Sequence, residues 1–477
     1  MLRTHRIDEL SEELAGKKVT LTGWVDTIRE HGSVIFLDLR DRYGEVQTVL
    51  NKKNSEFEKA KEITKESCIQ IEGEVKKRPK GAEKQTELEK IEISIDSVKI
   101  LSKAEPLPFD IERKDVNEDI RLKYRYLDLR TTKMAKNLKL RHDAVKFVRD
   151  YLDKKGFLEI QTPILTKSSP EGARDYLVPS RVHPGNFYAL PQAPQQYKQL
   201  LMVSGVDKYF QIAPCFRDED ARAYRSPGEF YQIDMEMSFV EQEDILQLVE
   251  DMMIKLVKKV FPDKKIQKIP FPRIPYDEAM KKYNSDKPDL RKNKNDKNEL
   301  AFAWVVDFPL FVKQSEEDYF HGAGKNLAPS HHMFTAPKKE DVKLLDKEPE
   351  KARSYQHDLV LNGLEVGGGS IRIHDREIQG KIFDLIGFTE KQKKEFAHLL
   401  EAFKYGVPPH GGIAPGLDRL LMAIMGTDSI RELIAFPKNR EVRDLTVGAP
   451  SEIDKEQLGE ANIEVSKKAK EKLKKQD

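Results

Sequence analysis

The sequence predicts an α+β protein in which a small N-terminal β-barrel precedes a larger domain of mixed helices and strands. Short β-rich segments alternate with turns over the first hundred residues. The stretch 103–118 then carries two prolines and many charges, which is typical of a linker between domains. Residues 133–157 follow with apolar side chains at helical spacing and lead into a strand. A chain of 477 residues has room for about two to four such domains.

The N-terminal segments follow the strand order of an OB-fold barrel. Strands are expected over 17–30, 33–41, 44–51, 68–78 and 90–101, with a short helix over 56–64. One helix between the third and fourth of five strands is the OB arrangement, although another small β-barrel fits the pattern equally well. OB surfaces bind nucleic acid with stacking aromatic rings. Phe36 offers such a ring, but core packing is the simpler interpretation of that residue taken alone.

Composition excludes several classes of protein. The formal net charge of +2 does not indicate a nucleic-acid binder. Two cysteines, Cys68 and Cys215, are too few for a disulfide scaffold or a four-cysteine zinc site. The apolar run 420–425 is too short to span a bilayer, and the first sixteen residues lack a signal-peptide core. We therefore expect a cytoplasmic protein with no membrane partner. The sequence also has no P-loop, no GxGxxG after a strand, no HExxH and no GxSxG.

Three segments carry the chemistry. FLEIQTPIL (157–165) is a strand that ends near a proline, and GIAPGLDRLLMAIMG (412–426) is a Gly/Pro turn that opens an apolar helix. Between them, residues 215–239 place Arg217 and Glu219 before a charged loop and a second strand. In this order, behind an OB-like module, they resemble motif 1 (about 138–165), motif 2 (about 210–239) and motif 3 (412–426) of the class II aminoacyl-tRNA synthetases.

Further segments resemble one family within that class almost from end to end. SPEGARDYLVPSRVHPGNFYALPQAPQQYKQLLMVSGVDKYFQIAPCFRDED (169–220) is similar to the aspartyl-tRNA synthetases of the bacterial type, as are RLKYRYLDLR (121–130), YNSDKPDLR (283–291), HHMFTAP (331–337), DLVLNGLEVGGGSIRIHD (358–375) and DLTVGAPSEID (444–454). The resemblance implies an OB-fold anticodon-binding domain over 1–104, a hinge over 105–130 and a class II catalytic domain over 131–477. That domain is expected to be an antiparallel β-sheet flanked by helices, and motif 1 implies a homodimer.

The implied reaction has two steps. L-aspartate and ATP form aspartyl-adenylate and pyrophosphate, and aspartate then passes to the 3′ end of tRNA-Asp. ATP would be used with Mg²⁺, and no tightly bound organic cofactor is expected. Catalysis of phosphoryl-type transfer consists mostly of positioning and charge neutralisation. Arginines suit this task because a guanidinium grips phosphate or carboxylate through two parallel hydrogen bonds.

The resemblance assigns residues to these steps. The catalytic set is Arg217, Glu219 and Arg419. The ATP-binding set is Arg217, Asp218, Glu219, Phe230, Glu365, Gly416, Leu417, Asp418 and Arg419. Phe230 and Arg419 would hold adenine between them. Asp358 and Glu365 match the magnesium carboxylates, and the Asn362-Gly363 pair between them predicts a hairpin that brings both to one cation.

Recognition of aspartate and of the anticodon is assigned in the same way. The aspartate-binding set is Glu171, Gln195, Lys198, Arg217, Asp234, His331 and Arg372. Lys198 and Arg372 match the cations for the side-chain carboxylate, so asparagine would face two cations with a neutral amide. The anticodon-binding set is Arg29, Phe36, Gln47 and Glu92, with Phe36 stacking on a base.

The chain departs from the bacterial pattern at three places. The inserted domain of about a hundred residues is absent near 270–300. The motif-2 loop has Ser226 where a glutamine contacts ATP, and Gly228 lengthens that loop by one residue. His31 stands where strict and relaxed anticodon readers differ, which suggests a relaxed enzyme that also charges tRNA-Asn.

Four alternatives remain to be weighed. A sister enzyme for asparagine or lysine is disfavoured by Lys198 and Arg372. A catalytically silent tRNA-binding paralogue would have lost Arg217, Glu219, Arg372 or Arg419, and all four are present. A stand-alone amide-forming enzyme would not need the OB domain. The relaxed form that charges both tRNAs keeps the whole site.

Overall fold

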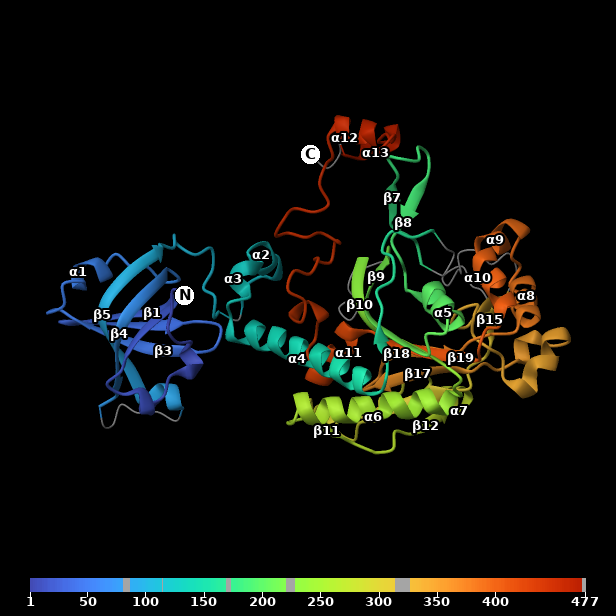
Figure 1. The fold of residues 1–477 in the computed structure, drawn as a ribbon, viewed down its shortest axis with the longest axis horizontal. Helices are drawn as coiled ribbons and strands as arrows, with labels where there is room; N and C mark the ends of the chain where they lie inside the picture. The colour runs from blue at the N-terminus through green and yellow to red at the C-terminus, as the bar shows by residue number, and fades with distance from the viewer. Residues whose placement is uncertain (80–85, 114, 169–172, 220–227, 314–326, 474–477) are drawn as a thin grey trace. The chain divides into compact units, whose positions relative to one another are not determined.

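The chain divides into two units, residues 1–116 and 117–477. The structure is a computed structural model, and it describes residues 1–79, 86–113, 115–168, 173–219, 228–313 and 327–473 (Figure 1). Among these residues no helix is both long and apolar enough to cross a membrane.

The first unit is a closed five-stranded barrel, so the predicted OB fold is confirmed. Its strands, in the order β1-β2-β3-β5-β4, are β1 (Lys18–His31), β2 (Val34–Arg40), β3 (Glu45–Asn51), β5 (Ile91–Ser102) and β4 (Cys68–Lys77), and α1 (Phe57–Ala60) lies between β3 and β4. Alternate residues face inward, as Val19 and Leu21 do in β1, because successive side chains of a strand point to opposite faces. Phe36 is half-buried and lies outside the barrel core.

The second unit is built on an eight-stranded sheet. Its order is β12 (Arg273–Pro275), β14 (Phe302–Val306), β17 (Gln356–Leu361), β18 (Leu364–Ile371), β19 (His410–Pro415), β10 (Gly228–Ser238), β9 (Lys208–Arg217) and β6 (Leu158–Glu159). The central strands are antiparallel as expected, but the outer pairs β12–β14 and β6–β9 are parallel, so the sheet is mixed. Parallel neighbours need a crossover, and a helix lies between the members of each pair in the sequence.

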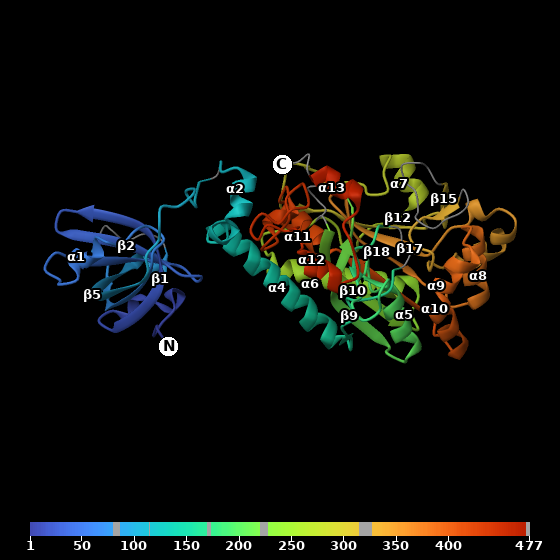
Figure 2. The ribbon, with the colours of Figure 1, turned by 90° about the horizontal axis from the view of Figure 1, so that it is seen from above.

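Helices cover this sheet. The long helices α4 (Thr132–Lys154) and α6 (Gln242–Val260) pack against each other, with α4 crossing α6 (Figures 1 and 2). The apolar helix α11 (Leu417–Met425) packs on β10 and β18, and α5 (Gln195–Val203) packs on β9 and β10. One large core therefore joins the three predicted motif segments.

Shorter elements complete the described chain. The helices are α2 (Glu118–Lys123), α3 (Arg125–Asp128), α7 (Tyr276–Tyr283), α8 (Arg376–Leu385), α9 (Glu390–Glu395), α10 (Ala397–Ala402), α12 (Lys455–Glu460) and α13 (Lys467–Leu473). The strands are β7 (Leu177–Pro179), β8 (Phe187–Ala189), β11 (Lys265–Ile266), β13 (Glu299–Leu300), β15 (Phe311–Lys313) and β16 (Leu327–Pro329). The 3-10 turns are η1 (Ile7–Glu9), η2 (Glu12–Leu14), η3 (Glu87–Lys90), η4 (Lys339–Asp346), η5 (Pro349–Lys351), η6 (Phe403–Tyr405) and η7 (Ile430–Glu432).

The expected hinge over 105–130 includes residues that belong to the second unit. Helices α2 and α3 belong to the second unit, which begins at Asn117. The reason is the buried side chain of Arg125, which donates to the backbone carbonyls of Arg431, Ile434 and Ala435. A charged stretch can be part of a packed unit when its charges are paired in this way, and Arg125 also pairs with Asp128.

The chain passes from α7 to β13 through residues 284–298, and no domain is inserted near 270–300. The compact connection leaves β12 and β14 paired in the sheet.

We predict that Gly412→Ala destabilises the second unit by about 2–3 kcal/mol, because added atoms in a packed core must be accommodated by strain. A Cβ at Gly412 would lie 2.0 Å from the Met235 carbonyl oxygen and 2.2 Å from Glu236 Oε2. Urea unfolding followed by Trp304 fluorescence in a Trp24→Phe background measures the change. The matched control is Gly380→Ala in α8, where a Cβ meets no atom within 4 Å. An equal effect of both substitutions would contradict the prediction.

Candidate active site

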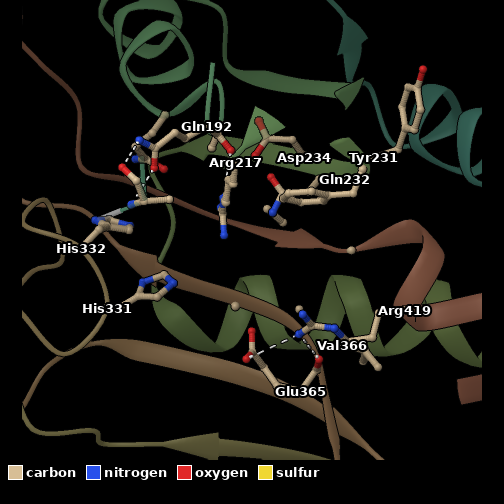
Figure 3. Close-up of a pocket in the computed structure, with 18 of the residues that line it drawn as sticks. Gln192, Arg217, Tyr231, Gln232, Asp234, His331, His332, Glu365, Val366 and Arg419 are labelled. Atoms are coloured by element: carbon tan, nitrogen blue, oxygen red, sulfur yellow. Dashed lines mark hydrogen bonds and ion pairs between the residues drawn. The ribbon is translucent and has the colours of Figure 1, made fainter. Parts of the chain in front are cut away.

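A cavity of about 380 Å³ opens in the second unit where the motif-2 and motif-3 segments meet (Figure 3). Its walls come from β9, β10, β18, α5, the start of α11 and the segment 331–334. Of the predicted site residues, the following line it: Gln195, Lys198, Arg217, Glu219, Phe230, Asp234, His331, Glu365, Arg372, Gly416, Asp418 and Arg419. The fold thus brings together residues that are more than two hundred positions apart in the sequence.

One side of the cavity presents a guanidinium and an aromatic ring. Arg217 ends β9, Phe230 lies on the neighbouring β10, and the Arg217 guanidinium carbon is 5.1 Å from the centre of the Phe230 ring. Arg217 Nε also donates to the Gln192 carbonyl oxygen at 3.4 Å. This arrangement suits a phosphate next to a planar base.

A second guanidinium lies on the motif-3 side. Arg419 stands in the first turn of α11, and its Nη1 donates to the Glu365 carbonyl oxygen at 2.9 Å. The same nitrogen is 3.8 Å from Glu365 Oε2 (Figure 3). Gly416 is the residue before this helix and also lines the cavity.

Three predicted ATP residues have other surroundings. The carboxylate of Asp418 pairs with Arg141 through one oxygen and accepts from the Tyr231 amide through the other at 3.3 Å. The side chain of Leu417 belongs to the core, and Asp218 is exposed beside Arg174. Both carboxylate oxygens of Asp418 and the side chain of Leu417 are therefore already engaged within the protein.

Asp358 and Glu365 face each other across the predicted hairpin. Asn362 and Gly363 both have positive φ and form the tight turn between β17 and β18. A Cβ built at Gly368 would be 3.3 Å from Asp358 Oδ1 and 3.6 Å from Glu365 Oε1, so the two carboxylates flank one point.

Their environment fits a cation. Burial, and then repulsion from Glu365, raises the pKa of Asp358 well above its ordinary value. Gln356 Nε2 holds Asp358 by donating to both of its oxygens at 3.2 and 3.3 Å. Mg²⁺ is commonly bound by one or two carboxylates together with substrate phosphates, and two converging carboxylates beside Arg419 supply that set. Among the described residues no cluster of three or more metal-ligating side chains exists.

Four buried charges lie together at the inner end of the cavity, and Lys198, Asp234 and Arg372 among them line it. Lys198 Nζ lies 2.5 Å from Asp234 Oδ1 and 3.4 Å from Glu236 Oε2. Arg372 holds Glu236 with two hydrogen bonds of 2.9 and 3.1 Å. Two cations and two carboxylates therefore neutralise each other. We call these four side chains the buried charge network.

Two polar atoms near this network have no hydrogen-bond partner in the described part of the chain: Asp234 Oδ2 and His331 Nδ1. Burial is the largest cause of the raised pKa of Asp234, and Lys198 opposes it. Burial, and then the charge of Arg372, lowers the pKa of His331 to about 3, so its ring is neutral at pH 7. Buried groups without partners are costly, and a polar ligand would satisfy them.

Some functional residues were missed and others lie outside the described residues. Glu236 was not assigned a role, although its spacing of two from Asp234 on one strand places both side chains on one face. His332 was also missed, and its Nε2 is 2.6 Å from Arg372 Nη1. Glu171 and Ser226 lie outside the described residues.

In the barrel unit, three of the four predicted anticodon residues, Arg29, Gln47 and Glu92, form one hydrogen-bonded row with Asp38. Arg29 Nη2 donates to Asp38 Oδ1 at 2.9 Å and to Gln47 Oε1 at 3.3 Å. Gln47 Nε2 in turn donates to Glu92 Oε2 at 3.2 Å. Phe36 stands beside them in an open cavity of about 520 Å³ that His31 also lines. A ring flanked by polar groups is the pattern that binds unstacked bases.

Comparison with known proteins identifies the family. Residues 117–440 match the family described as "tRNA synthetases class II (D, K and N)", and residues 19–101 match the "OB-fold nucleic acid binding domain". The first match spans more than half of the chain.

The chain belongs to the class II tRNA synthetases.

Relatives of this class II synthetase match it along nearly its whole length. The aspartate–tRNA(Asp/Asn) ligase of Syntrophomonas wolfei is 41% identical and covers 98% of this chain and 100% of the relative. The protein of the same name from Thermoanaerobacter is 43% identical, with 97% and 98% covered. A solved structure of asparaginyl-tRNA synthetase from Pyrococcus horikoshii has a TM-score of 0.73 at 25% identity, and covers 92% of this chain and 98% of that one.

The alignment with the Syntrophomonas relative spans 596 positions, whereas this synthetase has 477 residues. The relative therefore contains a substantial number of residues with no counterpart here, which agrees with the absent inserted domain. The predicted family and the predicted fold class are both confirmed.

We predict that the synthetase loses stability as the pH falls from about 6.5 to about 3. His357 is buried and His331 is partly buried, and desolvation followed by the charge of Arg372 lowers the pKa of each to about 3. Within this window the unfolded chain binds more protons than the folded one, so the free energy of unfolding rises with pH. Each such histidine contributes up to about 1.4 kcal/mol per pH unit.

Urea unfolding between pH 5 and 7, followed by Trp304 fluorescence in the Trp24→Phe background, tests this dependence. Trp304 meets the His357 ring edge-on at 6.1 Å between centroids, so it reports on the same core. His357→Gln should show a shallower slope below pH 6.5. Identical slopes in the two proteins would refute the assignment.

Proposed function

We propose that this synthetase is an aspartate–tRNA ligase. It activates L-aspartate with ATP, releases pyrophosphate and transfers the aspartyl group to the 3′ end of tRNA. The observation that carries the proposal is the buried charge network at the inner end of the cavity, together with the curated relatives named aspartate–tRNA(Asp/Asn) ligase.

The network suits an acidic amino acid. Lys198 and Arg372 place two cations within a buried pocket, where a side-chain carboxylate gains strong, poorly screened interactions. The partnerless Asp234 Oδ2 is an acceptor for the α-ammonium group. An aspartate molecule thus finds cations at one end and an anion at the other.

The outer part of the cavity suits ATP. Arg217 would neutralise charge at the α-phosphate and the attacking carboxylate, and its position over Phe230 places that charge next to the adenine. Arg419 would close the opposite face of the base. When bound with ATP, Mg²⁺ supplies charge neutralisation at the phosphates, and Asp358 and Glu365 are the residues that would hold it.

The barrel supports tRNA as the acceptor of aspartate. The row of Arg29, Gln47 and Glu92 beside Phe36 would read and stack the anticodon bases. The relatives' names include both tRNA-Asp and tRNA-Asn, and His31 lines the barrel cavity beside Phe36. Both observations favour an enzyme that charges tRNA-Asn as well as tRNA-Asp. A homodimer formed through motif 1 and a cytoplasmic location belong to the same proposal.

Two alternatives are less well supported. An asparagine enzyme has structural support from the Pyrococcus likeness, but a neutral amide would leave Lys198 and Arg372 without an anionic partner from the substrate. A silent tRNA-binding paralogue has no need for the intact set of Arg217, Arg372 and Arg419 around one cavity.

We predict that Lys198→Met lowers kcat/KM for aspartate by about a hundredfold or more in ATP–pyrophosphate exchange. The reason is the loss of one partner of a buried charge pair, which typically costs about 2–5 kcal/mol. ATP binding without aspartate should persist, because Lys198 lies at the inner end of the cavity.

Lys208→Met is the matched control, since Lys208 bonds the Lys155 carbonyl oxygen and does not line the cavity. Circular dichroism establishes that each variant is folded. Unchanged aspartate kinetics in folded Lys198→Met would refute the proposed aspartate site.

We predict that the purified enzyme charges transcripts of both tRNA-Asp and tRNA-Asn with aspartate. The anticodons of the two tRNAs differ at one position, so a relaxed pocket suffices for both. Phe36→Ala should slow both reactions by about tenfold or more, because base stacking on an aromatic ring contributes about 1–3 kcal/mol. The same variant should leave ATP–pyrophosphate exchange unchanged. Charging of tRNA-Asp alone would contradict this prediction and would show that the enzyme is specific for that tRNA.

A further inference from the structure

Arg141 reaches from α4 to the first turn of α11. It pairs with Asp418, and it also lies over the ring of Tyr231 at 5.9 Å from guanidinium carbon to ring centre. The side chains of Arg141 and Asp418 are only 19% and 5% exposed. A pair with so little exposure is weakly screened by solvent, so the interaction differs from an ordinary surface ion pair.

Asp418 joins three elements at one point. Its helix is α11, one carboxylate oxygen meets Arg141 of α4, and the other accepts from the Tyr231 amide of β10 at 3.3 Å. Asp418 stands in the first helical turn, where the partial positive charge of the helix N-terminus also favours a carboxylate. The start of α11 is therefore tied to both α4 and β10.

The neighbours of these tied residues line the ATP side of the cavity. Arg419 follows Asp418, and Phe230 precedes Tyr231. Gly416 bridges to Gln232 on β10 and donates its amide to the Val366 carbonyl oxygen. A shift of the first turn of α11 against β10 would change the separation of Arg419 and Phe230, the two groups proposed to hold adenine.

We infer that Arg141 is a positioning residue of the ATP site, which acts through Asp418 to fix Arg419 opposite Phe230. The inference rests on the proposed function, because the ligand is the ATP of the activation step. It also gives Asp418 a role different from direct contact with ATP through its side chain.

The test compares Arg141→Met, Asp418→Asn and the double variant in the full-length protein. Equilibrium dialysis with ATP alone, in the absence of aspartate, measures nucleotide affinity without turnover. ATP–pyrophosphate exchange then gives separate KM values for ATP and aspartate. Lys139→Met is the matched control, because Lys139 lies on the same helix and pairs with the partly exposed Asp143.

We expect Arg141→Met to raise both the Kd and the KM for ATP by about tenfold, because small displacements of positioning groups have large effects. The KM for aspartate should stay within about twofold, and Lys139→Met should resemble the wild type. The double variant should be no worse than the more affected single variant, since both substitutions break one interaction. Arg141→Lys should lie between wild type and Arg141→Met, because it keeps the charge without the planar fork.

Equal rises in KM for ATP and aspartate, additive effects in the double variant, or unchanged ATP affinity in folded Arg141→Met would overturn the inference. If circular dichroism shows that Arg141→Met does not fold, unchanged ATP affinity in both Arg141→Lys and Asp418→Asn would overturn it. A wild-type protein that neither binds ATP nor catalyses exchange would instead refute the proposed function.

Discussion

The buried charge network is the constraint on which the rest of the second unit depends. Removing Lys198, Arg372, Asp234 and Glu236 from water is costly, and each charge is tolerated only because opposite charges and hydrogen-bond donors meet it. The pKa of Glu236 falls even though burial, its largest influence, would raise it, since Arg372 and Lys198 outweigh that burial. The four side chains can meet only if α5, β10 and the end of β18 are brought to one place.

The order of the strands in the sheet makes this contact between the four side chains possible. Strand β19 lies between β18 and β10, and it carries Gly412 directly beneath the Glu236 carboxylate. A side chain at that position would occupy the space of Glu236 Oε2. Because β19 has a glycine at this position, the Glu236 carboxylate of β10 can extend over β19 and reach Arg372, which directly follows β18. The charge pairing in the site therefore depends on the strand order of the sheet.

Features with a local cause could be predicted from the sequence. The OB order follows from strand and turn signals in adjacent residues, and the hairpin that brings Asp358 and Glu365 together follows from Asn362-Gly363. The site residues came from a resemblance of motifs, and the fold gathers most of them around one cavity. Side-chain pairs between residues that are far apart in the sequence could not be predicted from such local signals. Arg141 and Asp418 are far apart in sequence, so nothing local shows that the carboxylate is already engaged.

The failure at the hinge has the same physical origin. The prolines and charges of 103–118 indicate a linker, the resemblance extends the hinge to 130, and the high charge of residues 117–130 does not by itself contradict that assignment. In the structure their charges are matched by partners from another part of the chain, such as Glu118 with Arg431 and Arg121 with Glu432. Charge density alone therefore does not separate a linker from a packed helix.

Both candidate sites use the same device, which is a set of polar groups that hold one another in place before a ligand arrives. In the cavity of the second unit, Lys198 and Arg372 are oriented by carboxylates, and in the barrel Arg29 is oriented by Asp38 and Gln47. Groups held in this way lose little conformational entropy on binding. They also discriminate, because a ligand that cannot replace or complete these contacts leaves buried polar groups unsatisfied. Selectivity for an acidic amino acid and for particular bases then follows from one principle applied in two separate units.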